Sequence, residues 1–201
     1  MFVLRFCIGL WMLCLPVALV AQDMVKYTQG FRFKDGIYLS FDDFRNNSPS
    51  IPLSQLYLSN GSQAQDVFER NQAMYVKNEV GELKKVKEYW GYSKNGRPYI
   101  EDERVLVVGA LTHFTRQETT TYYDPYMQTH ISSGTTLAQY ILDFSTGDFI
   151  HYTLRNFEAL LERDPPLYEE FMSIKRKRKR KKKMFMFLRK YNERNPIYFP
   201  E

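Results

Sequence analysis

A run of nine consecutive basic residues most constrains how this chain can fold. Charged side chains are almost never buried without partners, and an unbroken run places charge on every side of the element that carries it. That element must therefore lie at the surface. All nine residues are candidate contacts for an anionic partner: Lys175, Arg176, Lys177, Arg178, Lys179, Arg180, Lys181, Lys182 and Lys183.

Apolar residues flank the basic run at helical spacing. They are Leu167, Phe171 and Ile174 before the run, and Phe185 and Leu188 after it. Residues three and four positions apart share one face of a helix. The pattern therefore predicts one helix that packs against the core at both ends and is exposed, and basic on every side, in its middle.

The first residues have the layout of a secretory signal peptide. Arg5 ends a short basic segment, residues 6–20 are almost entirely apolar, and Ala21 is a small residue suited to cleavage. An apolar core of about 15 residues is shorter than the roughly 20 that a spanning helix needs. We expect a signal peptide over 1–21 and one exported domain over 22–201, located in the periplasm, at the outer cell surface or outside the cell. A retained signal anchor is the alternative.

Cysteine usage follows from that expectation. Both cysteines, Cys7 and Cys14, lie in the expected signal, so the exported chain would have no thiol. Disulfides, thiolate nucleophiles and zinc–cysteine sites are then excluded, and the hydrophobic core has to stabilise the domain. A lysine-rich run directs a protein to the nucleus only from the cytosol, so export also excludes that interpretation.

The basic charge of the chain is concentrated in one segment. The sequence has 28 basic and 23 acidic residues, but without residues 1–21 and the basic run the remainder has 18 basic and 23 acidic residues. A diffuse nucleic-acid-binding surface needs basic residues spread over one face, and we expect no specific nucleic-acid partner. A local contact with an anionic partner remains open.

The region from residue 72 to residue 153 is predicted to be rich in strands. Apolar and polar residues alternate there between turn signals, which predicts six or seven strands in a mostly antiparallel meander. Asn95-Gly96 is a strong hairpin signal, and Gly147 suits a left-handed turn in a second hairpin. Residues 104–114 contain branched apolar residues and are predicted to be the most buried strand, whereas residues 119–134 are predicted to form a long polar loop rich in tyrosine.

Helices are predicted on both sides of the strands. Ser40, with Asp43 three residues later, favours a capping box that begins a short N-terminal helix. Two helices are expected in the segment 155–193, the first capped by Asn156 and the second beginning at Asp164-Pro165. The predicted fold class is therefore α+β, in a single domain.

Four stretches of the sequence carry a resemblance: GIYLSFDDFRNNSP, WGYSKNGRPYIE, YILDFSTGDF and LLERDPPLYEEF together with the ending YNERNPIYF. On these stretches the chain resembles a family of exported bacterial proteins of unknown function. The resemblance implies secretion and an α+β domain, and it implies no activity and no cofactor.

Few residues suggest catalysis. The sequence has no nucleophile elbow, phosphate-binding loop, zinc-protease helix or dinucleotide-binding turn. His113 and His151 fall in predicted strands, where they are either ordinary histidines or partners that share a metal with a carboxylate. His130 has no ligand spacing. We therefore assign no catalytic, cofactor or metal residue.

Two other clusters have a structural and a functional interpretation. Residues 101–103, Glu-Asp-Glu, are either a solvated turn or paired carboxylates for sugar hydrolysis. Tyr122, Tyr123 and Tyr126 are either ordinary strand residues or a platform on which sugars or peptides stack.

Three functions follow from these observations. The leading hypothesis is a non-catalytic binding or envelope-associated module with a protein or glycan partner at the cell envelope. The first alternative is a protein that binds lipid headgroups or a polyanion through the basic run. The second is a hydrolase whose site is assembled from scattered histidines and carboxylates.

Overall fold

The computed structural model describes residues 23–28, 30–100, 103–104 and 109–201. Four α-helices and antiparallel sheets make up these residues, which confirms the α+β class. The expected signal peptide lies outside the described residues, as do Glu101 and Asp102 of the acidic cluster. Among the described residues, no helix is both long and apolar enough to cross a membrane.

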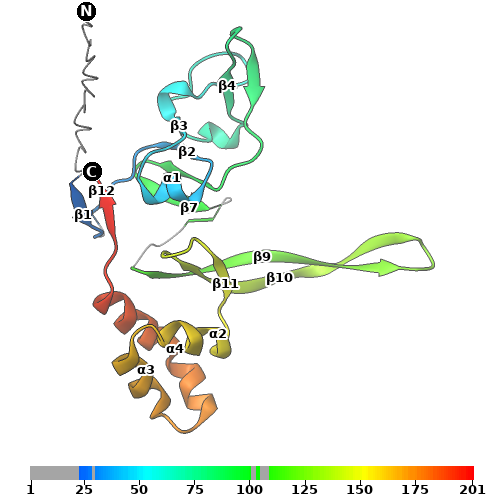
Figure 1. Cartoon of the computed structure of the whole chain (residues 1–201). Helices are drawn as coiled ribbons and strands as arrows, with labels where there is room; N and C mark the ends of the chain where they lie inside the picture. The colour runs from blue at the N-terminus through cyan, green and yellow to red at the C-terminus, as the bar shows by residue number, and fades with distance from the viewer. Residues whose placement is uncertain (1–22, 29, 101–102, 105–108) are drawn as a thin grey trace, which may run out of the picture.

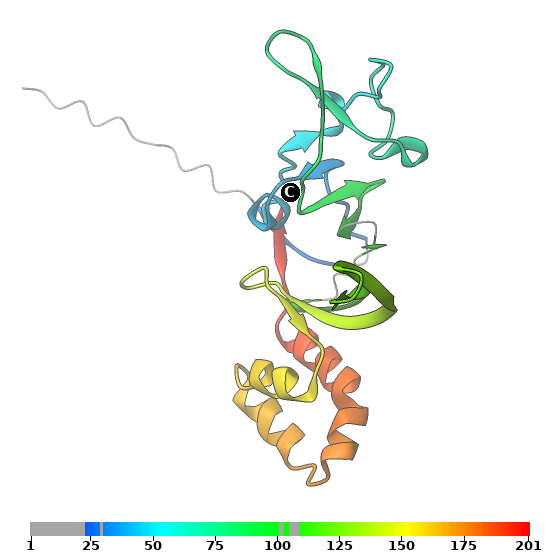
Figure 2. The same ribbon diagram turned by 90° about the vertical axis from the view of Figure 1, so that its right-hand side faces the viewer.

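The molecule has three parts arranged along one axis (Figures 1 and 2). Strands near the N-terminus form one end and the C-terminal helices form the other. A three-stranded sheet lies between them, and two of its strands extend sideways as a long hairpin. The first strand, β1 (Met24–Lys26), pairs antiparallel with the last, β12 (Tyr198–Pro200).

The N-terminal part contains a five-stranded antiparallel sheet and a separate hairpin. The sheet has the order β3-β2-β6-β7-β8. Its strands are β2 (Gly36–Tyr38), β3 (Ile51–Pro52), β6 (Gly91–Lys94), β7 (Arg97–Ile100) and β8 (Glu103–Arg104). The hairpin joins β4 (Tyr75–Lys77) to β5 (Leu83–Lys85), and 3₁₀ turns occupy Leu53–Gln55 and Glu69–Asn71.

The two local signals predicted in this part are confirmed. Helix α1 (Phe41–Arg45) begins with the expected capping box, in which Ser40 and Asp43 each bond to the other's backbone N–H. Asn95 and Gly96 have φ values of 53° and 68° and turn β6 into β7. Asp35 accepts the Gly96 N–H at 2.8 Å, which fixes this turn from outside the hairpin.

The central sheet has the order β11-β10-β9, and it corrects two predictions. Its strands are β9 (Leu111–Asp124), β10 (Thr129–Asp143) and β11 (Phe149–His151), and the Gly147 turn between β10 and β11 is confirmed. The expected polar loop at 119–134 is instead the paired far half of β9 and β10. Threonine and tyrosine favour strands, and a ribbon with solvent on both faces does not need apolar alternation. Of the strand expected over 104–114, residues 105–108 lie outside the described residues, Arg104 ends β8 and Leu111 begins β9.

The number and the order of the strands also differ from the prediction. The described residues contain twelve strands in four sheets, in place of six or seven in one meander, and strands occur on both sides of the predicted region 72–153. Strands of two or three residues, such as β2 and β3, are too short to show an alternating pattern.

Three helices follow the sheet in the described chain, where two were expected: α2 (Leu154–Leu161), α3 (Pro165–Met172) and α4 (Lys177–Arg194). The expected cap Asn156 is wrong, because Thr153 is the N-cap residue of α2 and accepts the Asn156 N–H at 3.3 Å. The expected start at Asp164-Pro165 is confirmed, since Asp164 caps α3 and Pro165 is its first residue. The helices bury Phe157, Phe171 and Phe187 against one face of the central sheet.

The buried amide of Asn192 joins α4 to β9. Its Oδ1 accepts the Leu111 N–H at 2.9 Å, and its Nδ2 donates to the Leu111 carbonyl at 2.7 Å. A side chain at Gly109 would place its Cβ 2.5 Å from the Asn192 Cβ, so this close approach requires glycine. The amide thus takes the place of a neighbouring strand at the start of β9.

Candidate anion-binding surface

The basic run lies at the start of α4 and in the connection before it, not in the middle of one long helix as predicted. Lys175 and Arg176 belong to the connection, and Lys177–Lys183 form the first turns of α4. The helical backbone is interrupted before most of the run, between Ser173, which is the C-cap residue of α3, and Arg176, which is the N-cap residue of α4. The break lets α4 fold back along α3 and bury its apolar stripe.

The buried stripe of α4 differs from the expected one. Met184, Phe187, Leu188 and Tyr191 are buried, whereas Phe185 is 45% exposed. Phe185 instead covers the ring of His113 on β9, with the ring centroids 5.4 Å apart. Leu188, expected on the same stripe, is buried as predicted.

Arg180 differs from the other eight residues of the run, because it is half-buried and has partners. Its Nε donates to Glu158 Oε1 on α2 at 2.9 Å, and its Nη1 donates to the Ile174 carbonyl at 3.1 Å. These bonds connect α4 to α2 and to the segment that joins α3 to α4. Sequence pattern could not have separated Arg180 from its neighbours, since Glu158 lies 22 positions away.

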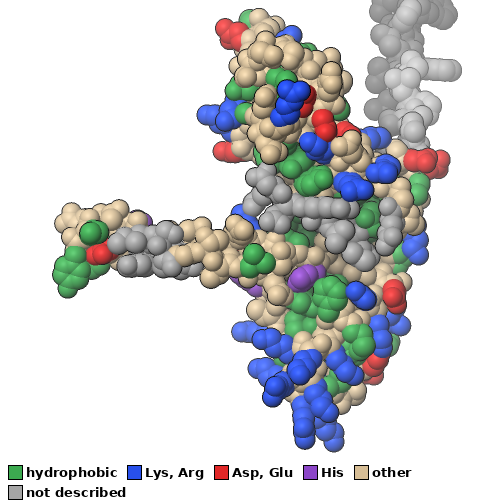
Figure 3. Space-filling view, turned by 180° about the vertical axis from the view of Figure 1, so that it is seen from behind, with side chains coloured by type: hydrophobic (Ala, Val, Ile, Leu, Met, Phe, Trp, Pro, Cys, Tyr) green, Lys and Arg blue, Asp and Glu red, His purple; other side chains and the backbone are tan. Residues whose placement is uncertain are grey.

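The other eight cations are exposed, and within the described part of the chain no carboxylate lies at ion-pair distance from them. Figure 3 shows blue side chains gathered at the end of the helical part. The N-terminus of a helix carries a partial positive charge. Helix α4 has no acidic residue in its first turn, and Arg176 makes no capping hydrogen bond from its side chain. The positive charges of the run therefore lie at the positive end of the helix dipole, and both contribute to the positive potential there.

A hollow of about 480 Å³ opens beside these cations. It is lined by Tyr152, Thr153, Leu154, Lys177, Arg178 and Lys181. Burial raises the pKa of Tyr152 to about 12, so its hydroxyl stays neutral at physiological pH. The hollow thus combines the apolar surface of the β11–α2 connection with three cations of α4, a combination that sequence spacing does not indicate.

The histidines do not form a metal site. His113 is opposite Ile141 and His151 is opposite Tyr140, and neighbouring strand residues point to opposite faces, so the two histidines lie on opposite faces of the sheet. His130 lies far along the hairpin, where its ring contacts Tyr123. Among the described residues, no three histidine, cysteine or acidic side chains gather closely enough to hold an ion.

One histidine and one carboxylate share a partner. The Tyr140 hydroxyl donates to Glu118 Oε1 and lies 3.3 Å from His151 Nε2. The hydrogen bond to Glu118 is the main cause that raises the pKa of Tyr140. The contact links β9 to β10 near the base of the hairpin.

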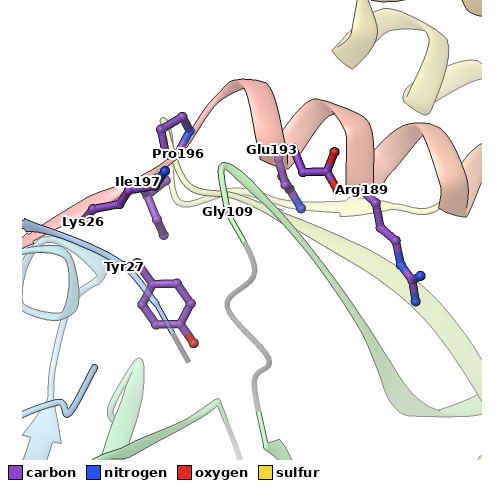
Figure 4. Close-up of a pocket in the computed structure, with 8 residues that line it drawn as sticks. Lys26, Tyr27, Gly109, Arg189, Glu193, Pro196 and Ile197 are labelled. Carbon is purple, nitrogen blue, oxygen red and sulfur yellow. The ribbon is translucent and has the colours of Figure 1, made fainter. Parts of the chain in front are cut away.

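A second hollow of about 440 Å³ lies near the C-terminal end of α4 (Figure 4). Lys26 and Tyr27 come from the N-terminal segment, and Arg189 and Glu193 come from neighbouring turns of α4. Glu193 is the only carboxylate among the described lining residues, which include neither histidine nor cysteine. The hollow does not contain the paired carboxylates that the hydrolase alternative requires.

Comparison of the chain with known protein families, with curated proteins and with solved structures found no match. The resemblance to exported bacterial proteins therefore stays a prediction.

Proposed function

We propose that this protein is a non-catalytic binding module that attaches to anionic surfaces through eight cations of the run 175–183, those that have no ion-pair partner among the described residues. The observation that supports this function is the concentration of these charges at one end of the folded molecule, whereas the remaining residues carry more acidic than basic side chains. Such a distribution attracts a negative surface and orients the protein toward it. Arg180 is not among the contacts, because Glu158 already pairs with it.

The ligand class that suits this surface is the acidic phospholipid headgroup. Each lysine or arginine near an anionic membrane contributes about 1 kcal/mol, and the attraction decays over a Debye length of about 8 Å at physiological salt. The hollow beside Lys177, Arg178 and Lys181 adds an apolar floor beneath three cations. A headgroup with the first carbons of its chains presents the matching chemistry. We include export in the proposal, with residues 1–21 as the signal peptide.

The test is co-sedimentation with vesicles of neutral lipid, with and without an acidic phospholipid. We expect the protein to bind only the acidic vesicles and to lose binding as salt is raised. A variant with Lys177, Arg178, Lys181 and Lys182 changed to glutamine is expected to lose most of the binding.

The matched control removes the same charge elsewhere. It changes the exposed Lys84, Lys85, Lys87 and Arg97 to glutamine and should bind like the parent. Equal losses in the two variants would show that net charge alone drives binding and would contradict the proposal. Binding to heparin-like polymers without binding to acidic vesicles would overturn the choice of lipid.

A further inference from the structure

The hairpin formed by β9 and β10 extends far from the rest of the molecule as a two-stranded ribbon (Figures 1–3). Strand β11 covers β10 only from Tyr140 to Leu142. A two-stranded hairpin alone in water is marginally stable at best, and pairing with a further strand would stabilise it. The outer edges of the hairpin are therefore candidates for strand pairing.

The outer edge of β9 is regular and has no partner strand among the described residues. Asn192 bonds to both backbone groups of Leu111, so Leu111 turns these groups away from β10. In an antiparallel ladder every second residue repeats that orientation. The residues whose backbone groups face outward are therefore His113, Thr115, Gln117, Thr119 and Thr121. No hydrogen bond to the outward backbone groups of the five edge residues occurs within the described part of the chain.

Strand β9 has only part of the usual protection of an exposed edge. Natural edge strands carry charged side chains, above all lysine, or proline or a bulge, and residues 113–121 contain no lysine and no proline, with Arg116 and Glu118 as their charged residues. The register of β9 with β10 shifts between Ser132 and Gly134, so the bulge interrupts β10, whose edge is also partly covered by β11. The edge of β9 is thus the one suited to a partner strand.

We propose that β9 pairs antiparallel with β9 of a second copy of this chain, about a two-fold axis at Gln117. Charge selects this register. Centred on Gln117, the pairing places Arg116 opposite the partner's Glu118, and the symmetry repeats the pair. Centred one residue earlier or later, it places Arg116 opposite the partner's Arg116, or Glu118 opposite the partner's Glu118, and like charges directly opposite each other are destabilising.

The same register accounts for the exposed tip. It aligns Tyr123 with the partner's Leu111, so the turn that follows reaches the start of the partner's hairpin. Tyr126 and Met127 in that turn are 97% and 71% exposed, and the dimer would bring them against the partner molecule. Nine paired residues span about 30 Å at roughly 3.3 Å each, which is a small contact, and we expect a weak dimer that depends on concentration.

The first test is cysteine cross-linking in a chain whose Cys7 and Cys14 are replaced by serine. Opposite residues of a hydrogen-bonded pair have Cα atoms about 5.5 Å apart, within reach of a disulfide. Gln117→Cys is therefore expected to form a covalent dimer under mild oxidation. Thr119→Cys is the matched control, because its partner copy lies about 13 Å along the strand in this register.

A mixture extends the cross-linking test. Thr119→Cys mixed with Thr115→Cys is expected to cross-link, since the two-fold axis places these residues opposite each other. Equal cross-linking of Gln117→Cys and Thr119→Cys would overturn the register. The absence of any cross-link, in a protein that stays monomeric in sedimentation at high concentration, would overturn self-pairing and leave the edge to a strand of another protein.

The second test reverses charges and guards against misfolding. Arg116→Glu alone and Glu118→Arg alone each place like charges opposite each other, and each is expected to weaken the dimer. Mixed in equal amounts, the two variants restore opposite charges at both positions and should associate as well as the parent. Failure of the mixture to associate, when both variants unfold cooperatively, would contradict the proposal. The readout is sedimentation, so it is independent of any effect on anionic vesicles.

Discussion

The buried amide of Asn192 provides a sharp test of how the helical part is attached to the sheet. Asn192 is 5% exposed and Leu111 is fully buried, so the hydrogen bonds between them exclude water. Asn192→Ala leaves the N–H and the carbonyl of Leu111 without partners. An unsatisfied buried polar group costs about 1–3 kcal/mol, so we expect the free energy of unfolding to fall by about 2–5 kcal/mol.

Thermal unfolding followed by circular dichroism measures this loss. For a domain of this size, 1 kcal/mol shifts the midpoint by about 2–4 °C, so Asn192→Ala should lower it by roughly 5–15 °C. The control is Asn195→Ala, because Asn195 is only half-buried and its bonds, to the Tyr191 carbonyl and to the Asp164 carboxylate, leave no buried backbone group of the sheet without a partner when they are lost. It should cost less than about 1 kcal/mol.

A near-isosteric variant separates hydrogen bonding from packing. Asn192→Asp keeps the acceptor for the Leu111 N–H and faces the Leu111 carbonyl with an oxygen in place of a donor. Two effects raise the pKa of the new carboxyl: burial disfavours its charged form, and its protonated form can still donate a hydrogen bond to the Leu111 carbonyl. The variant should lose stability, relative to the parent, as pH rises above about 3.9. A midpoint for Asn192→Asp equal to that of the parent at neutral pH would refute the assigned role of the amide.

Four other outcomes are expected. The Tyr152 hydroxyl is buried without a partner among the described atoms, so Tyr152→Phe should leave the free energy of unfolding unchanged or raise it by up to about 1 kcal/mol. Tyr38→Phe loses the 2.7 Å hydrogen bond to the Lys34 carbonyl and should lower the free energy of unfolding by about 1 kcal/mol. Equal effects of Tyr152→Phe and Tyr38→Phe in denaturant melts would contradict the view that only the Tyr38 hydroxyl has a partner. Arg194 lowers the pKa of Asp164 chiefly through its hydrogen bonds, so that part of the stability is present above the carboxyl's ordinary pKa and lost as pH falls through the lowered value. Arg194→Gln should therefore reduce the loss of unfolding free energy as pH falls. An unchanged pH dependence below neutral pH would contradict the contribution of the Arg194–Asp164 pair. A strong chelator should leave the unfolding midpoint unchanged, because a structural metal would contribute stability directly, and a drop of several degrees would reveal a site not seen in the described residues.

Local signals predicted local structure well. Ser40 and Asp43 form a capping box, and Asn95-Gly96 forms a hairpin turn, because both depend on residues that are neighbours in the chain. Asp164 caps α3 for the same reason. In each case the partners lie within a few positions, so the spacing in the sequence is also the spacing in space.

The hairpin of β9 and β10 could not be predicted in the same way. Its far half lies in solvent on both faces, so no buried face imposes alternation, and the polar segment 119–134 resembled a loop. Pairing between the strands, favoured by threonine and tyrosine, determines the structure there. The break between α3 and α4 was missed because the apolar residues on the two sides of the basic run fit one helical register, although Phe185 lies off the buried stripe.

The sequence by itself determined that the basic run is exposed, because nine adjacent positive charges cannot be buried together in any fold. It also determined the caps and the short turns. The tertiary structure alone decided which charge of the run is used internally, since Arg180 meets Glu158 only after α4 packs against α2. It likewise decided that Asn192 completes the edge of β9, with 81 positions between the bonded residues. Contacts over such separations depend on how the helices and the sheet pack together, and no local spacing encodes them.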